Sequence, residues 1–243
     1  MIQKNTVHLY YANLYHYGGN NPVKYVDPDG RRFNRPLSHI KQTDFSNPAV
    51  YMGTTPSGSY SINESGEKTF SKRNTIFNYG CLFTEVFNNA SSSRKNYAKQ
   101  HNIPYKDFSL PFFASNDEYF VFEDSKTHSN ESDANMNVSG ITKLFEDVSG
   151  RSIKGISVYT IDQKFTNKNM KDKLIELKQA NKSYTVIGKC MGHYFTILDC
   201  DDKGNISYSM IHDPQSQIYY NWYKNFKAEL EKNGVNTLIV IEQ

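Results

Sequence analysis

The run Tyr194-Phe195-Thr196-Ile197-Leu198-Asp199-Cys200 is followed by Asp201-Asp202-Lys203-Gly204-Asn205 and then by Ile206-Ser207-Tyr208-Ser209-Met210-Ile211. Two runs rich in β-branched and aromatic residues, separated by a polar segment with a glycine, are typical of a β-hairpin. A turn centred between residues 202 and 204 pairs residues whose numbers sum to about 405 or 406. We therefore expect His193, just before the first arm, to lie opposite His212 or Asp213.

Regular patterns extend from this hairpin in both directions. Apolar residues at helical spacing predict four helices, over 81–89, 138–148, 169–180 and 222–233. Short β-rich runs predict strands over 156–160, 184–187 and 237–241, with shorter ones near 49–52 and 60–62. The polar run Glu123 to Asp133, which contains His128, is expected to be a solvated loop. Helices come early and antiparallel strands late, which indicates an α+β fold.

One cysteine stands where a helix is expected to begin, in Tyr79-Gly80-Cys81-Leu82-Phe83-Thr84. A helix N-terminus presents unpaired N–H groups and a partial positive charge, which lower the pKa of a thiol. Gly80 lets the backbone turn sharply into the helix. Cys81 is therefore a candidate nucleophile.

A base and an orienting group are expected at one end of the hairpin. His193 and Asp213 lie close together if the register is as predicted, and a carboxylate there can hold the imidazole in one tautomer. Gly192 leaves space beside His193 for a substrate chain. A thiol, an imidazole and an orienting carboxylate are the minimum set for cysteine-based acyl transfer. The alternatives at each position are an inert buried cysteine, a strand-end histidine and a plain turn at Asp213-Pro214.

Composition excludes several function classes. The net charge of +3, from 28 basic and 25 acidic residues, is too balanced for a polyanion binder, so we expect no nucleic-acid partner. No apolar run is long enough to cross a membrane, and the N-terminus carries no signal-peptide core. The three cysteines, Cys81, Cys190 and Cys200, do not form a disulfide framework. We expect no cofactor. A zinc site at Cys190, His193, Cys200 and His212 is disfavoured because His193 and Cys200 are expected on opposite faces of one strand.

These motifs resemble the papain-fold cysteine peptidases, in particular the type that processes bacteriocin precursors with a double-glycine leader. The resemblance rests on Gly80-Cys81-Leu82-Phe83-Thr84, on Gly192-His193-Tyr194-Phe195-Thr196-Ile197 and on Asp213-Pro214, and it spans residues 76–243. It implies helices packed on a C-terminal antiparallel sheet. It also implies Cys81 as nucleophile, His193 as general base and acid, and Asp213 as the orienting group. That family commonly has a glutamine upstream of the cysteine; here Asn74 or Asn78 is the candidate oxyanion donor, beside the backbone N–H of Cys81.

The N-terminal segment carries a second resemblance. Asn13-Leu14-Tyr15-His16-Tyr17, Asn20-Asn21-Pro22 and Tyr25-Val26-Asp27-Pro28-Asp29-Gly30 are similar to the closing motif of the Rhs-repeat-associated core. The family has a frequent leucine where Arg31 stands, so cleavage at this point is open. We therefore expect a core tail at 1–35, a polar linker or propeptide-like segment at 36–75 and a papain-like catalytic domain at 76–243. Whether the segment at 31–75 occludes the cleft is also open.

The resemblance implies a toxin that is secreted as part of a larger Rhs-type protein. It would act on a protein or peptide substrate in the cytoplasm of a target cell, with a separately encoded immunity protein as partner. Peptide hydrolysis is the default reaction, and deamidation or transamidation of a protein glutamine uses the same chemistry. A papain-fold module that has lost catalysis and only binds a partner is a further alternative, and a nuclease toxin is the third.

Overall fold

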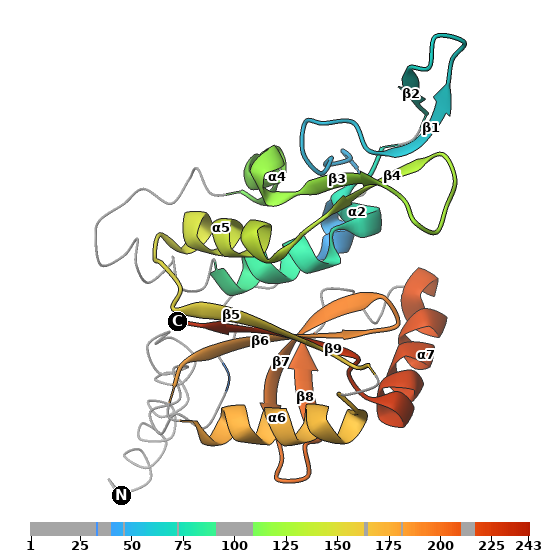
Figure 1. The fold of residues 1–243 in the computed structure, drawn as a ribbon. Helices are drawn as coiled ribbons and strands as arrows, with labels where there is room; N and C mark the ends of the chain where they lie inside the picture. The colour runs from blue at the N-terminus through green and yellow to red at the C-terminus, as the bar shows by residue number, and fades with distance from the viewer. Residues whose placement is uncertain are drawn as a thin grey trace, which may run out of the picture.

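The computed structural model describes residues 33, 40–45, 47–71, 73–90, 109–162, 165–180, 182–209 and 217–243, with the backbone alone at 217–224. These residues form a mixed α/β structure with two antiparallel sheets (Figure 1). The architecture is compatible with the expected α+β class.

The larger sheet has five strands in the order β5-β9-β6-β7-β8. Its strands are β5 (Gly155–Thr160), β6 (Tyr184–Cys190), β7 (His193–Cys200), β8 (Ile206–Ser209) and β9 (Thr237–Glu242). All neighbouring strands are antiparallel, and β9, the last strand in sequence, lies between β5 and β6. The last strand in sequence therefore lies inside the sheet and not at its edge.

Helices cover both faces of this sheet (Figure 1). A helix at residues 81–90 and α5 (Val138–Ser149) lie on one face, towards the smaller sheet. On the other face lie α6 (Asn167–Gln179) and α7 (Gln217–Asn233). The alternation of side chains in the strands separates two hydrophobic clusters, because Ile187 and Ile239 point to the first face whereas Val186 and Leu238 point to the second.

The smaller sheet has the order β2-β1-β4-β3. Its strands are β1 (Gly58–Ile62), β2 (Lys68–Phe70), β3 (Val121–Asp124) and β4 (Glu131–Asn135). The hairpin of β1 and β2 projects from the body of the molecule (Figure 1). The short elements around this sheet are η2 (Gln42–Phe45), α2 (Ile76–Tyr79), α4 (Leu110–Ala114) and η3 (Asp117–Tyr119). The segment expected as a linker, 36–75, thus includes two strands, and β1 pairs with β4 of the later chain.

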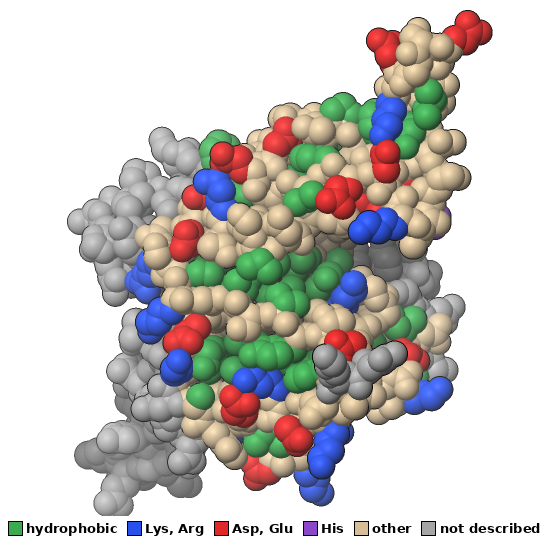
Figure 2. Space-filling view, viewed as in Figure 1, with side chains coloured by type: hydrophobic (Ala, Val, Ile, Leu, Met, Phe, Trp, Pro, Cys, Tyr) green, Lys and Arg blue, Asp and Glu red, His purple; other side chains and the backbone are tan. Residues whose placement is uncertain are grey.

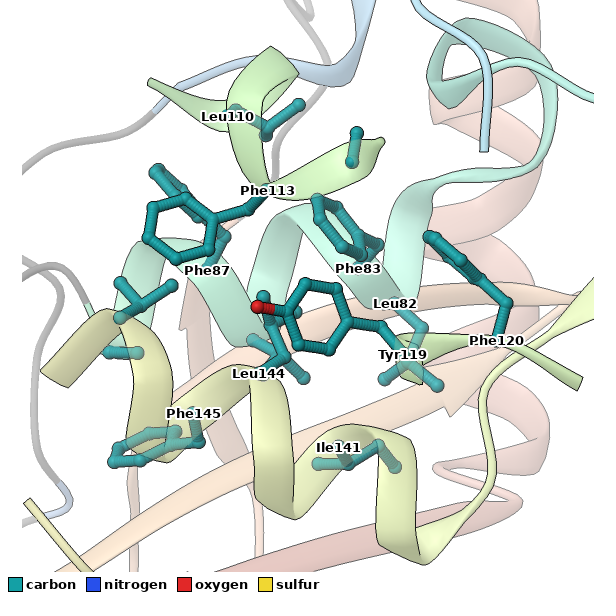
Figure 3. Close-up of a cluster of buried hydrophobic side chains, with 14 of the residues drawn as sticks. Leu82, Phe83, Phe87, Leu110, Phe113, Tyr119, Phe120, Ile141, Leu144 and Phe145 are labelled. Carbon is teal, nitrogen blue, oxygen red and sulfur yellow. The ribbon is translucent and has the colours of Figure 1, made fainter. Parts of the chain in front are cut away.

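The helix at residues 81–90 is the centre of the first hydrophobic cluster (Figure 3). Nine of its residues are buried, all except Cys81. Phe83 stacks on Phe120 with ring centroids 5.4 Å apart, and Phe87 packs against Phe113 of α4 at 5.7 Å. A helix that is buried all round is positioned by packing rather than by solvent, so the placement of its first residue is well defined.

Most expected elements are present. The helix from Cys81, the helix closed by Gly150 and the C-terminal strands are confirmed, and Gly150 has the left-handed φ of 67° that favours glycine at a helix end. Two helices begin earlier than expected. In α6 the cause is a capping box, in which Thr166 and Asn169 bond each other's backbone N–H.

The loop expected at Glu123–Asp133 is shorter than predicted. Residues 125–130 form a turn, whereas the two ends of the run belong to the hairpin of β3 and β4, in which Phe122 pairs with Ala134 and Asp124 with Ser132. The hairpin forms because Ala134 and Phe122 pack on the hydrophobic cluster around the helix at 81–90. This burial involves residues that are distant in sequence, so the polarity of the run itself does not predict it. His128 lies in the exposed turn.

On the face shown in Figure 2, hydrophobic side chains gather across the middle of the molecule, and charged side chains lie mainly towards the periphery. Within the residues that the structure describes, no helix has both the length and the apolar character needed to cross a membrane.

Candidate active site around Cys81

Cys81 is the first residue of the buried helix at 81–90, as the sequence predicts. The preceding turn, α2, is capped by the Thr75 side chain and ends at Gly80, whose N–H donates to the carbonyl of Ile76. Gly80 has an ordinary φ of −86°. A Cβ atom at this position would lie 2.6 Å from the Cα of Ile76, so glycine is needed for close approach and not for an unusual turn.

The environment of the thiol differs from the expectation. We expected the helix start to lower the pKa of Cys81, but the pKa is raised above its usual value. Burial is the largest cause, because it disfavours the charged thiolate. The backbone N–H groups of Tyr194 and Leu82 act in the opposite direction, so the predicted helix effect is present but is outweighed by desolvation.

Two ionisable side chains also act on the thiol. Glu85, one turn further along the helix, raises the pKa of Cys81 when its carboxyl is ionised, and Lys189 lowers it. Lys189 lies opposite Tyr194 in the pairing of β6 and β7, and its Nζ is 5.0 Å from the centre of the Tyr194 ring. Cys81, Tyr194 and Lys189 thus form one group at the junction of the helix and the sheet.

His193 is the first residue of β7, as predicted, directly opposite Cys190. The two-residue turn between them has positive φ at both Met191 (50°) and Gly192 (74°), the geometry of a tight hairpin. Among the described residues, no atom beyond the two chain neighbours lies within 4 Å of a Cβ built at Gly192, so these residues leave the space expected beside this glycine open.

The imidazole of His193 is buried, with a residue exposure of 6%. It packs edge-to-face on Phe226 of α7, with ring centroids 6.1 Å apart. Phe226 belongs to the cluster on the face covered by α6 and α7, whereas Tyr194 contacts the cluster that contains the helix at 81–90. The structure therefore brings the thiol of Cys81 to the backbone beside His193, while the imidazole points to the other face of the sheet.

The predicted register of β7 and β8 is confirmed for the described part of the two strands. Thr196 pairs with Ser209 and Ile197 pairs with Tyr208, so the residue numbers of each pair sum to 405. Cys200 pairs with Ile206, and these residue numbers sum to 406. A β-bulge between Ile197 and Asp199 accounts for the change. His212 and Asp213 lie outside the described residues.

Because of the same bulge, the expectation that His193 and Cys200 lie on opposite faces of one strand, which disfavoured a zinc site, is wrong. The extra residue places Cys200 in the cluster on the α6 and α7 face, which is also the face of His193. The two residues stand at opposite ends of β7. Burial raises the pKa of both Cys190 and Cys200 to about 11, and all three cysteines are free thiols.

The two oxyanion candidates are in different environments. Asn74 is buried, and its Nδ2 donates to the carbonyl of Ser132 in the smaller sheet at 3.2 Å. Its amide therefore has a structural partner away from the thiol. Asn78 is exposed on α2, three residues before Cys81. Of the two, Asn78 keeps a side-chain amide that is accessible from solvent.

A buried polar cluster behind Cys81 was missed by the sequence reasoning. The Thr196 hydroxyl donates to Oε2 of Glu85 at 2.6 Å, and Nδ2 of Asn89 donates to the Thr196 hydroxyl oxygen at 2.7 Å. All three residues are at most 3% exposed. A signal was available, because Cys81, Glu85 and Asn89 follow each other at four-residue spacing and therefore lie on one face of the helix.

Burial without a cationic partner changes the charge of Glu85. Desolvation is the largest cause that raises its pKa, from the ordinary 4.5 to about 8, so the carboxyl is mainly protonated at neutral pH. Oε1 of Glu85 and Oδ1 of Asn89 are both buried acceptors with no hydrogen-bond partner among the described residues. A proton on the carboxyl turns one acceptor into a donor and reduces this mismatch.

Comparisons of the chain with protein-family models, with curated proteins and with solved structures found no significant match in any of the three.

Proposed function

We propose that the chain is a toxin effector domain that cleaves amide bonds through Cys81, in the manner of a papain-like cysteine peptidase. One observation carries the proposal: the thiol lies at the N-terminus of a buried helix, against the backbone N–H of Tyr194, the residue that follows His193. The resemblance to papain-fold peptidases implies the same arrangement, with cysteine at the start of a helix packed on an antiparallel sheet and histidine at the start of a strand.

The reaction assigns each group one task. His193 takes the proton of the Cys81 thiol, and the sulfur attacks the carbonyl carbon of the substrate amide. The amine leaves with that proton, and a thioester joins the substrate to Cys81. Water then attacks the thioester, releases the acid and restores the thiol. When the substrate is a glutamine side chain the leaving group is ammonia, so deamidation follows the same steps.

The resting structure requires one movement before this reaction. The His193 imidazole must turn from Phe226 towards the strand end, where Gly192 provides open space. In apoenzymes the catalytic groups are often further apart than in the substrate complex. Proton transfer to His193 also overcomes the raised pKa of the half-buried thiol, because the thiolate then forms beside an imidazolium.

A second candidate is a module of this fold that binds a partner without catalysis. The burial of His193 against Phe226 and the raised pKa of Cys81 both favour it. In that function the thiol contributes packing, and its chemical identity is unimportant.

Expression in bacteria separates the two. We expect wild type to arrest growth, and Cys81→Ala and His193→Ala to lose toxicity while the matched control Cys200→Ala keeps it. Circular dichroism of each purified variant verifies folding. Full toxicity of a folded Cys81→Ala variant would reject the peptidase and leave the binding module.

A further inference from the structure

A cavity of about 530 Å³ opens on the face of the sheet opposite to Cys81, between α6, β8 and the end of α7. This volume lies within the range of about 300–1,000 Å³ that is usual for small-molecule sites. Its floor is apolar and consists of Met170, Leu174, Ile206, Tyr208, Leu230 and Val235. No residue of the proposed active site lines it.

The walls of this cavity are held by local bonds and close packing. Asp201 accepts hydrogen bonds from the backbone N–H groups of Lys203 and Asn205 and from the Asn205 side chain, which fixes the tip of the β7–β8 hairpin. The tip sits on α6 at Gly204, where an added Cβ would lie 2.6 Å from the Cβ of Lys171. The cavity is therefore preformed rather than dependent on a flexible segment.

The rim of the cavity is cationic. Lys171, Lys227 and Lys232 line it, together with a single acid, Glu231. Lys227 is paired with Glu231 across 3.9 Å. Among the described residues, neither Lys171 nor Lys232 has an ion-pair partner, so two positive charges remain beside an apolar floor.

We propose that this cavity binds a free amphipathic anion with a single apolar chain. The apolar tail of the ligand lies on the floor formed by the six apolar side chains, and its anionic head lies at the rim near Lys171 and Lys232. Burial of this tail provides the affinity, and the two lysines without an ion-pair partner among the described residues favour a negatively charged head group. The inference is independent of the proposed peptidase activity, because it concerns the other face of the sheet.

Titration calorimetry of the full chain tests this site with sodium dodecanoate below its micellar concentration. Dodecyltrimethylammonium, which has the same tail and the opposite charge, is the matched probe. We expect one dodecanoate per chain. We also expect affinity for the cation to be at least about tenfold weaker, because the rim repels it.

Two variants with matched controls locate the binding. Lys171→Glu combined with Lys232→Glu should weaken dodecanoate binding by about tenfold or more, whereas Lys126→Glu with Lys154→Glu, which makes the same charge change at exposed positions outside the cavity, should not. Asn167→Trp fills the mouth from an exposed position of α6 and should abolish binding. Asp172→Trp, on the same helix but outside the cavity, should bind as wild type.

Several results would overturn the proposal. These are no heat of binding with dodecanoate, equal affinity for the two probes, or equal loss in the control variants. Flotation with phosphatidylglycerol vesicles distinguishes a free anion from a membrane lipid, and we expect no protein in the floating vesicle fraction. Vesicle binding that disappears in the Lys171→Glu, Lys232→Glu variant would replace the free ligand with a membrane surface.

Discussion

The hydroxyl of Thr196 donates a 2.6 Å hydrogen bond to Oε2 of Glu85 and thereby joins β7 to the helix that begins with Cys81. Thr196 lies two residues after Tyr194, whose N–H approaches the thiol, and Glu85 lies one turn after Cys81. The bond therefore sets how the helix and the strand meet at the candidate site.

Glu85→Gln should remove a pH dependence of stability. The pKa of Glu85 is about 8 in the folded chain and near 4.5 when unfolded, so its favourable contribution is complete below pH 4.5 and is lost as pH rises to about 8. The loss is on the order of 1 kcal/mol per pH unit within that interval. Urea unfolding between pH 4.5 and 8 should show a flatter profile for Glu85→Gln, and the exposed-turn control Glu64→Gln should follow wild type. Parallel profiles for Glu85→Gln and wild type would contradict the neutral buried carboxyl.

Lys189→Gln should slow the alkylation of Cys81. Lys189 lowers the pKa of the thiol, so removal of its charge leaves less thiolate at a given pH. The rate of iodoacetamide modification at Cys81, followed by peptide mass spectrometry, measures the effect. Lys189→Arg keeps the charge and should restore the rate, and Lys203→Gln on the hairpin tip should leave it unchanged. An unaltered rate in Lys189→Gln would show that the cation does not act on the thiol.

Asp117→Ala should destabilise the region that precedes the helix at 81–90. Asp117 accepts four hydrogen bonds, from the backbone N–H and the hydroxyl of both Thr54 and Thr55. Loss of this carboxylate leaves the exposed donors of Thr54 and Thr55 bonded to water, so the expected cost is that of the lost bonds, about 1 kcal/mol. The Thr54 and Thr55 bonds lower the pKa of Asp117 to about 2 from 3.8, although partial burial opposes them. The stabilisation is therefore present above pH 3.8 and is lost as pH falls through about 2.

Thermal unfolding at pH 7 tests Asp117→Ala directly. The control is Asp172→Ala, an exposed carboxylate on α6, which should leave the midpoint within error. A similar shift in both variants would mean that the four bonds contribute no more than an ordinary surface charge.

Gly140→Ala should destabilise the contact between α5 and η3. A Cβ at Gly140 would lie 2.2 Å from the carbonyl oxygen of Tyr119, a backbone atom that cannot move aside cheaply. Overpacking of this kind costs about 1–3 kcal/mol. At Gly155 no atom lies within 4 Å of an added Cβ, so Gly155→Ala is the matched control and should unfold at the wild-type midpoint or slightly above it. A wild-type midpoint for Gly140→Ala would show that the two elements can separate without cost.

The elements that depend on local signals were predictable. Asn137 and Gly150 mark the two ends of α5, and the turn from Asp201 to Asn205 sets the register of β7 and β8. These features follow from capping, turn geometry and the period of apolar residues, all of which act over a few neighbours.

The chemistry of the site depended on contacts between distant residues. Local sequence was sufficient to predict that Cys81 starts a helix and that His193 starts a strand. It was not sufficient to predict that His193 packs on Phe226, that desolvation outweighs the helix N-terminus at the thiol, or that Glu85 is buried and neutral against Thr196. Desolvation and the choice of sheet face depend on packing between segments that are distant in sequence, which local periodicity does not encode.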